Sequence, residues 1–226
     1  MIINLLNLFF PKVCLSCQNY LTDNEVHICT SCRHQLPLTN FHFDNENAVH
    51  KMMYGRVKLE QATALLHFSK KGRVQRLMHN LKYKGQEVVG QVLGEWLGEE
   101  LQASEQYKSV DVVVPVPIHP SKLRKRGYNQ VAKFGKALAQ ALNAEYVDSV
   151  LLKSKSTATQ VFKDRLTRSA TVEEGFSLFK PEIIKGKHIL LVDDIITTGS
   201  TLEACSQALL KAKDVKLSIA TMAITD

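Results

Sequence analysis

The sequence lacks the features that mark several classes of protein. No apolar run approaches the roughly 18 residues of a membrane-spanning helix, so we expect no membrane insertion. Internal repeats and low-complexity tracts are missing, and hydrophobic residues make up 45% of the 226 residues, which excludes a disordered or collagen-like chain. The phosphate-binding motifs G-x-x-x-x-G-K-[ST] and G-x-G-x-x-G are also absent. These absences leave a globular protein of one domain, or one domain with a small appendage.

Aromatic residues are scarce as well, at 7% of the chain, and they do not alternate with arginine. Proteins dedicated to single-stranded nucleic acid usually stack bases on aromatic side chains, so this scarcity argues against a dedicated role of that kind. Positive charge is concentrated in residues 69–85, 112–144 and 151–168, which hold six, six and five basic residues and one acidic residue. The whole chain carries only +7. This segregation predicts a cationic surface for an anionic partner, and three solvated helix faces are the alternative.

Four of the five cysteines form two C-x-x-C pairs, separated by eleven residues: Cys14, Cys17, Cys29 and Cys32. Each pair can direct two thiolates at one point, so we predict a closed, structural Zn2+ site. A disulfide framework is the alternative. Disulfides usually occur in secreted chains, and residues 1–10 lack the basic start and the A-x-A pattern of a secretory signal. We therefore expect a cytoplasmic protein. His27 and His34 are alternative ligands by their position in the sequence.

The hydrophobic pattern divides the chain at about residue 60. Residues 1–60 are expected to form an N-terminal helix stopped by Pro11, the zinc-binding region, and a polar linker or irregular lobe at 35–60. Residues 61–226 are expected to form a second region, in which strands alternate with helices.

The alternation in this second region predicts an α/β fold with a mostly parallel sheet flanked by helices. The expected strands are 62–68, 110–114, 144–147, 187–193 and 215–224, and the expected helices are 73–83, 88–101, 128–142 and 201–212. Such sheets bind ligands beyond the carboxyl ends of their strands. The functional loops should therefore follow Val114 and Val192.

The loop after Val192 is the most informative stretch of the chain. Two adjacent acids, Asp193 and Asp194, are followed by a turn of small and hydroxylated residues: Thr197, Thr198, Gly199, Ser200 and Thr201. Small residues let backbone N–H groups approach an anion, and the start of a helix adds a positive dipole. Carboxylates would repel a phosphate but can accept hydrogen bonds from sugar hydroxyls. The stretch therefore describes a ribose 5-phosphate site, and a plain helix N-cap is the alternative.

Residues 190–201 resemble the motif that binds 5-phosphoribosyl 1-pyrophosphate (PRPP) in type I phosphoribosyltransferases. Residues 114–130, V-P-V-P-I-H-P-S-K-L-R-K-R-G-Y-N-Q, resemble the signature of the competence-associated ComF/GntX family. The L-K-Y-K-G motif at 81–85 and the four-cysteine segment fit this family in the same order. The sequence departs from the family in the loop at 157–171, where Thr171 stands in place of asparagine and Lys163 in place of leucine.

The resemblance implies a type I phosphoribosyltransferase fold that binds PRPP with Mg2+ and releases pyrophosphate. Asp193 and Asp194 would hold the ribose hydroxyls, partly through Mg2+, and the turn at 197–201 would hold the 5-phosphate. Residues 153–170 would form a hood in which Arg168, with Gln160 and Arg165, closes over the site. Basic residues from two segments would bind the pyrophosphate: Lys82, Lys84, His119, Arg124 and Arg126. For His119 an ordinary turn residue is the alternative, and for 124–126 a solvated loop.

Two functions from different classes follow. The first is an enzyme that transfers a phosphoribosyl group to an acceptor that the sequence does not name. The second is a non-catalytic, PRPP-responsive protein that binds single-stranded DNA and competence proteins during DNA uptake. Pyrophosphate release would distinguish the first, and DNA binding that weakens steeply with salt would distinguish the second.

Overall fold

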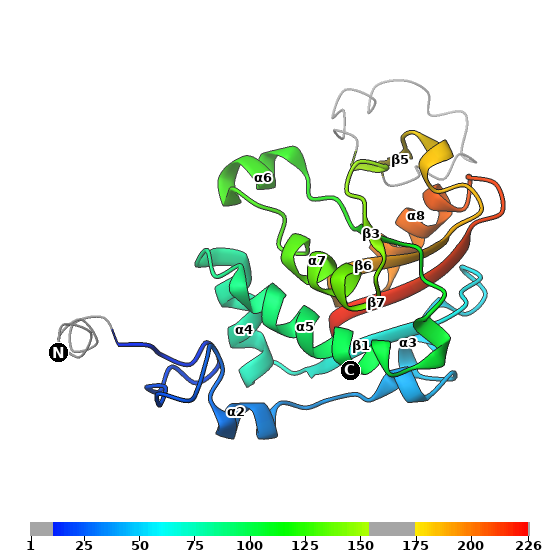
Figure 1. Cartoon of the computed structure of the whole chain (residues 1–226). Coiled ribbons are helices and arrows are strands. Elements are labelled where there is room, and N and C mark those ends of the chain that lie inside the picture. Colours follow the sequence, from blue (N-terminus) through cyan, green and yellow to red (C-terminus); the bar gives the residue numbers. More distant parts are fainter. Residues whose placement is uncertain (1–10, 154–174, 226) are drawn as a thin grey trace.

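The computed structural model describes residues 11–153 and 175–225 (Figure 1). The helix expected within residues 1–10 lies outside the described residues, and so do Gln160, Arg165 and Arg168 of the expected hood. In the described part of the chain, no helix is both long and apolar enough to cross a membrane.

The centre of the molecule is a sheet of five parallel strands in the order β1-β7-β6-β2-β3. Their bounds are β1 Ala62–Phe68, β2 Val112–Pro115, β3 Glu145–Tyr146, β6 His188–Ile196 and β7 Lys216–Thr225. Strands β6 and β7 are buried along almost their whole length, which explains their nearly continuous apolar sequences. The predicted α/β fold with a mostly parallel sheet is confirmed.

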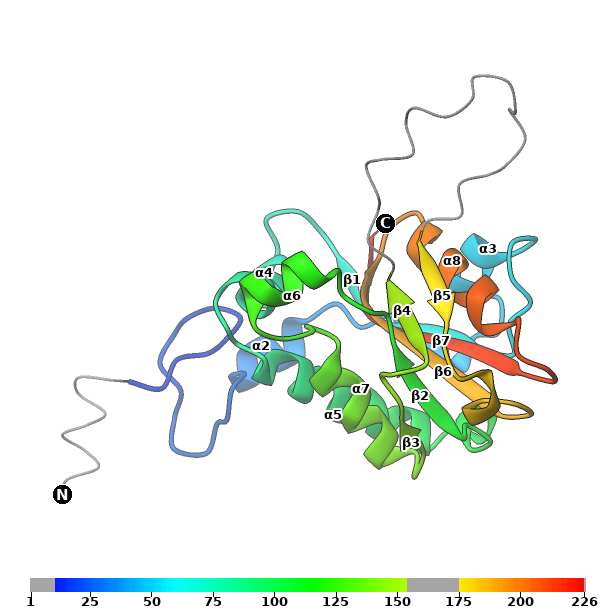
Figure 2. The same cartoon turned by 90° about the horizontal axis from the view of Figure 1, so that it is seen from above.

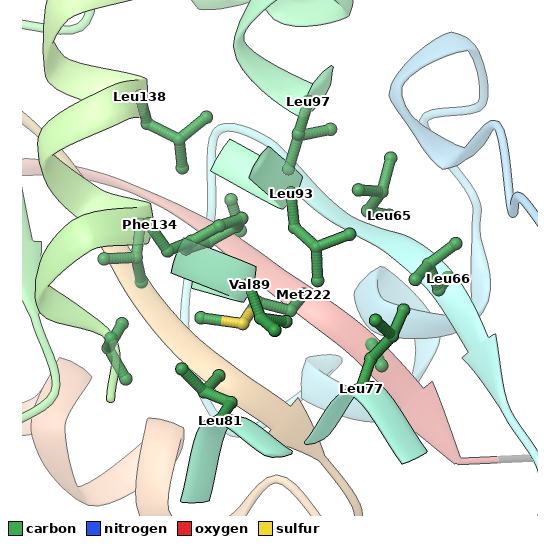
Figure 3. Packing of buried hydrophobic residues seen from close by; sticks show 14 of the residues in the cluster. Leu65, Leu66, Leu77, Leu81, Val89, Leu93, Leu97, Phe134, Leu138 and Met222 are labelled. Atoms are coloured by element: carbon green, nitrogen blue, oxygen red, sulfur yellow. The ribbon is translucent and has the colours of Figure 1, made fainter. Parts of the chain in front are cut away.

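Helices cover both faces of this sheet (Figure 2). One face carries α4 Arg73–Tyr83, α5 Val88–Gln102 and α7 Ala132–Ala141, and the other carries α3 Ala48–Met53 and α8 Ser200–Leu209. Successive side chains of β6 point to opposite faces of the sheet. Leu190 belongs to the core under α4, α5 and α7, and Leu191 to the core under α3 and α8. Figure 3 shows the first of these cores, where Leu77, Leu93 and Phe134 lie around Met222 of β7.

Helices α5 and α7 approach each other closely because α5 presents glycine to its neighbour. A Cβ atom at Gly94 would lie 2.7 Å from the carbonyl oxygen of Phe134, and one at Gly98 would lie 2.6 Å from the Cβ of Ala141. Distances this short leave no room for a methyl group. The spacing of these glycines at every fourth residue therefore serves helix packing.

Most expected elements are present, but the segment after β2 differs. Residues Pro120–Arg126 form a helix, α6, that the hydrophobic pattern does not predict, and α7 begins at Ala132 rather than at residue 128. None of the α6 residues is buried, so no apolar face marks this helix in the sequence. Its ends carry the signal instead: His119 is its N-cap, Pro120 its first residue, and Gly127 ends it at φ 85°.

Residues 35–60, expected as a linker or irregular lobe, contain a short 3-10 helix Phe41–Phe43 and α3. The Asn47 side chain joins this segment to the sheet, since its amide donates to the carbonyl oxygen of Ala62 at 2.7 Å and its oxygen caps α3. Leu38 also forms an isolated bridge with Leu66 of β1. These contacts fasten the segment to the α/β region, and the division at residue 60 stays a prediction.

The remaining elements are small. The N-terminal part, which we call the four-cysteine lobe (residues 11–36), contains the short helix α2 Thr30–Gln35. Two short 3-10 helices span Glu105–Tyr107 and Pro181–Ile183. An antiparallel pair, β4 Leu151–Lys153 and β5 Phe176–Leu178, lies beside α8.

Candidate functional site

The two adjacent acids lie within β6 rather than after it. Asp193 still pairs in register with Thr221 of β7, and the Asp193 and Asp194 side chains are buried, at 8% and 6% exposure. The backbone N–H of Asp194 donates to Asp193 Oδ1 at 2.8 Å. Burial and the neighbouring Asp194 charge raise the pKa of Asp193 to about 8, although the Asp194 amide, Lys82 and Lys153 act in the opposite direction.

Lys82 faces this acid pair from the last turn of α4. Its Nζ atom lies 3.0 Å from Asp194 Oδ2, and its side chain is largely buried. The helix is anchored in the first core by Leu77 and Leu81, and the Tyr128 hydroxyl donates to the carbonyl oxygen of Leu81. The structure therefore brings together Lys82 and the two acids, which are more than a hundred residues apart in the sequence.

The hydroxyl-rich turn connects the end of β6 to α8. Gly199 takes the left-handed conformation, at φ 78°, and occupies the N-cap position of α8. Thr197, Thr198 and Ser200 are exposed, and the Thr198 and Ser200 hydroxyls lie 3.0 Å apart. The N-cap Gly199 has no side chain to cap α8, and of the hydroxyls only that of Thr198 accepts a backbone N–H of the helix start, from Ser200 at 3.5 Å, among the bonds of the described residues. The turn thus presents hydroxyl groups and the N-terminus of a ten-residue helix at the same edge of the sheet as the acids.

Sequence reasoning missed the contribution of α3 and the residues that follow it. Arg56 Nη1 donates to the carbonyl oxygen of Thr198 at 2.8 Å and lies 3.6 Å from Glu203 Oε2. Met53 is buried against Gly199, where a Cβ atom would lie 3.1 Å from its sulfur. Arg56 lies outside the three basic windows, and 142 residues separate it from Thr198. No local pattern in the sequence marks this contact.

The basic residues from α4 and α6 line an open pocket of about 320 Å3. Its walls are Lys82, Tyr83, Gly85, Lys122, Lys125, Arg126 and Tyr128, and no acid is among them. Lys82 lines this pocket and also pairs with Asp194, so the pocket and the acid pair adjoin at this residue.

The other residues predicted to bind pyrophosphate, Lys84, His119 and Arg124, are not among the residues that line this pocket. Lys84 and Arg124 are exposed. The imidazole Nδ1 of His119 accepts the backbone N–H of Ser121 at 3.2 Å and lies 2.6 Å from the Ser121 hydroxyl, which makes it the N-cap of α6. Their predicted roles stay predictions.

The four cysteine side chains converge at the N-terminus. Their Sγ atoms all lie within 4.8 Å of one another. Backbone N–H groups of Ser16 and Cys29 donate to Cys14 Sγ at 3.4 and 3.3 Å, and that of Asn19 donates to Cys17 Sγ at 3.4 Å. Such donors favour thiolates over thiols, and four thiolates suit a tetrahedral Zn2+ ion. This group of residues could therefore hold the predicted zinc.

The alternatives for this region find no support. No disulfide joins any of the five cysteines, and His27 and His34 are exposed and outside the cluster. The lobe is attached to α4, because Arg76 Nη1 donates to the carbonyl oxygen of Ser16 at 2.9 Å and Asn80 Nδ2 donates to that of Leu15 at 2.8 Å. Helix α4 thus touches the four-cysteine lobe near its middle and the acid pair at its end.

Comparison with known families finds a match in the C-terminal part of the chain. Residues 132–226 match the phosphoribosyl transferase domain family. This part of the chain is therefore similar to phosphoribosyl transferase domains. The matched residues include the acid pair, the hydroxyl-rich turn and α8, whereas Lys82, α6 and Arg56 precede the matched part.

Three curated relatives are similar to the chain. The DNA utilization protein YhgH of Escherichia coli K12 is 28% identical over 60% of each chain. The competence protein ComFC of Streptococcus pneumoniae is 34% identical over 60% of this chain and 57% of its own, and the competence protein F of Haemophilus influenzae is 24% identical over 90% and 93%. The match to YhgH thus spans about 60% of that protein's length. The resemblance to the competence-associated ComF family is confirmed.

Among solved structures, a glutamine PRPP amidotransferase from Bacillus subtilis is 20% identical to this chain. The match covers 62% of this chain and 30% of that one, with a TM-score of 0.43.

Proposed function

We propose that this protein binds PRPP with Mg2+ at the carboxyl edge of its sheet and transfers the phosphoribosyl group to an acceptor. The observation that carries the proposal is the placement of a buried acid pair between a hydroxyl-rich turn and Lys82, whose Nζ lies 3.0 Å from Asp194. A ribose 5-phosphate needs an anion site and a hydroxyl acceptor a few ångströms apart, and this edge offers both.

The turn and the acid pair would bind different parts of the ribose 5-phosphate. The phosphate would accept hydrogen bonds from the backbone and hydroxyls of Thr198 to Thr201 at the positive end of α8. The ribose hydroxyls would donate to Asp193 and Asp194, which favours their ionised forms. Because the pKa of Asp193 is about 8 in the free protein, ligand binding at neutral pH should release a proton.

The same acids fit Mg2+, since carboxylate oxygens are the ligands this ion prefers and their mutual repulsion favours a shared cation. When bound, Mg2+ would supply charge neutralisation for the diphosphate. Lys82 would contact the diphosphate directly, at the boundary between the acid pair and the basic pocket.

The transfer breaks the bond between C1 of the ribose and the pyrophosphate oxygen and forms a bond from C1 to the acceptor. Negative charge collects on the departing pyrophosphate, and cations placed in advance lower the barrier by stabilising it. Lys82, Lys122, Lys125 and Arg126 surround the pocket in which that group would lie. These residues hold the leaving group in position while the turn holds the other end of the substrate.

The proposal is tested by titrating the full chain with PRPP and Mg2+ in a calorimeter and then assaying pyrophosphate release with a panel of nucleobases and other acceptors. We expect binding that Asp193→Ala abolishes and that Asp148→Ala, at an exposed acid, leaves intact. Absence of PRPP binding by the wild-type chain would refute the site. PRPP binding without turnover on any acceptor would refute the transferase reaction.

A second function, PRPP-responsive binding of single-stranded DNA together with competence proteins, is favoured by one observation. Tyr83 and Tyr128 line the basic pocket, and Tyr83 is 72% exposed, so a base could stack beside several cations. The names of the relatives, which refer to DNA utilization and competence, agree with this candidate. The cytoplasmic location expected for either function stays a prediction.

Fluorescence anisotropy with a labelled single strand, at several salt concentrations and with or without PRPP, tests this candidate. Tyr83→Ala should weaken binding severalfold, whereas Tyr20→Ala, which removes an equally exposed tyrosine from the four-cysteine lobe, should not. Binding that is insensitive to salt or to Tyr83→Ala would contradict it.

A further inference from the structure

The outer side of the hydroxyl-rich turn is covered by residues 52–56, which precede the sheet in sequence. Met53 is fully buried there, and the sulfur atoms of Met53 and Met52 lie 3.1 and 3.5 Å from where a Cβ atom of Gly199 would be. Arg56 Nη1 lies 3.6 Å from the same point and donates to the carbonyl oxygen of Thr198 at 2.8 Å. The segment therefore holds the backbone of the turn as well as covering it.

The direction of this hydrogen bond determines where the next donor points. In a trans peptide the C=O and the N–H lie on opposite sides of the bond, and no cis peptide occurs among residues 11–153 and 175–225. The carbonyl of Thr198 and the amide of Gly199 belong to the same peptide. With the Thr198 carbonyl held toward Arg56, the Gly199 N–H points away from Arg56.

Within the turn, the Thr198 hydroxyl accepts the Ser200 N–H at 3.5 Å and the Gly199 carbonyl oxygen accepts the Glu203 N–H at 2.8 Å. Neither bond involves the Thr198 carbonyl or the Gly199 N–H. Rotating the peptide between Thr198 and Gly199 changes the φ of Gly199, and glycine adopts positive and negative φ with similar ease. The observed φ of 78° is thus one of several accessible values. A guanidinium that binds the Thr198 carbonyl selects one of them, and Glu203, 3.6 Å away, orients that guanidinium from the first turn of α8.

We propose that Arg56 is a positioning residue for the 5-phosphate subsite, which it serves by locking the 198–199 peptide with its N–H directed to the ligand. The inference rests on the proposed function, because it assigns the phosphate of PRPP to this turn. The positive charge of Arg56 lies on the other side of this peptide from the ligand and adds to the field of the α8 N-terminus. A phosphorylated sugar, rather than free pyrophosphate, is the ligand class that depends on Arg56.

The test compares three ligands by calorimetry on the full chain: PRPP with Mg2+, ribose 5-phosphate, and pyrophosphate with Mg2+. Arg56→Gln should weaken PRPP and ribose 5-phosphate about tenfold, as expected for the loss of one charge-assisted hydrogen bond, and should leave pyrophosphate affinity unchanged. Lys58→Gln is the matched control, since it removes the same charge from an exposed residue nearby. Arg56→Lys, which keeps the charge, should recover part of the loss.

A second readout separates positioning from general destabilisation. The amide resonance of Gly199 should move on addition of ribose 5-phosphate in the wild-type chain and much less in Arg56→Gln. Equal weakening of all three ligands, or unchanged affinity for the two phosphorylated sugars, would overturn the inference. If the wild-type chain binds neither phosphorylated sugar, the proposed function fails first, and this result is distinct from failure of Arg56 alone.

Discussion

The buried acid pair predicts that replacing Asp193 by asparagine stabilises the protein, and that the gain depends on pH. The pKa of Asp193 is raised from 3.8 to about 8 by burial and by the charge of Asp194. A carboxyl group whose pKa is higher in the folded state favours folding below its unfolded pKa, near 4, and this advantage is lost as pH rises toward 8. Asparagine has nearly the same shape, and its oxygen can still accept the Asp194 amide.

The magnitude follows from proton linkage. Between the two pKa values the folded state binds one proton more than the unfolded state, which changes the free energy of unfolding by about 1.4 kcal/mol per pH unit. Relative to wild type, Asp193→Asn should therefore gain roughly 4 kcal/mol between pH 5 and pH 8. Above pH 8 the difference should level off, because Asp193 is then ionised in both states.

Urea unfolding at pH values from 5 to 9 measures this difference directly, provided that the urea dependence is the same in both chains. Asp148→Asn, at an exposed position, should show no comparable rise. A difference between Asp193→Asn and wild type that stays constant with pH would refute the reasoning. It would mean that the Asp193 carboxyl is already ionised near pH 5, with Lys82 and its other partners outweighing its burial.

Two other predictions concern packing and the metal. Gly98→Ala should cost about 1–3 kcal/mol, because its Cβ would lie 2.6 Å from that of Ala141, and Ala141→Gly should restore most of this loss in denaturant titrations. Ala137→Gly should rescue Gly94→Ala poorly, because there the carbonyl oxygen of Phe134 lies 2.7 Å away; equal rescue at both positions would contradict the contacts. Removing metal with a chelator should abolish amide protection in the four-cysteine lobe first, and hydrogen exchange that stays unchanged would argue against a structural metal there.

The regular core of the fold was predictable because burial leaves a periodic trace in the sequence. The bounds of α4 agree with the expected helix at 73–83, since Val74, Leu77, Met78 and Leu81 form one apolar stripe. Strand β6 runs three residues further than expected, to Ile196. Its two acids are polar and suggest a strand end, but pairing with β7 continues beyond them. The neighbouring strand, rather than the side chains, keeps this part extended.

The site was predictable only where its residues are contiguous. The acids and the turn lie in one stretch of twelve residues, and Lys82 lies in a short motif, so both could be proposed from the sequence. The contact of Arg56 with Thr198 spans 142 residues and depends on how α3 packs beside α8. Helix α6 escaped prediction because an exposed helix has no apolar face. The Arg56 contact depends on tertiary arrangement, of which a single sequence carries no local record, whereas the local signals of α6 are confined to its two ends.

The strand order has a consequence for how the molecule is made. Ala62 at the start of β1 pairs with Ile219 of β7. These two strands are therefore neighbours in the sheet, although they are far apart in the sequence. During synthesis β1, α4 and α5 leave the ribosome long before β7, and until then the inner edge of β1 has no strand to pair with. The strand that carries the acid pair, β6, also lacks a neighbour until β7 is made, because β7 lies between β6 and β1. We therefore expect the central sheet to close late, after translation of β7, with the exposed apolar strands dependent on chaperones in the interval.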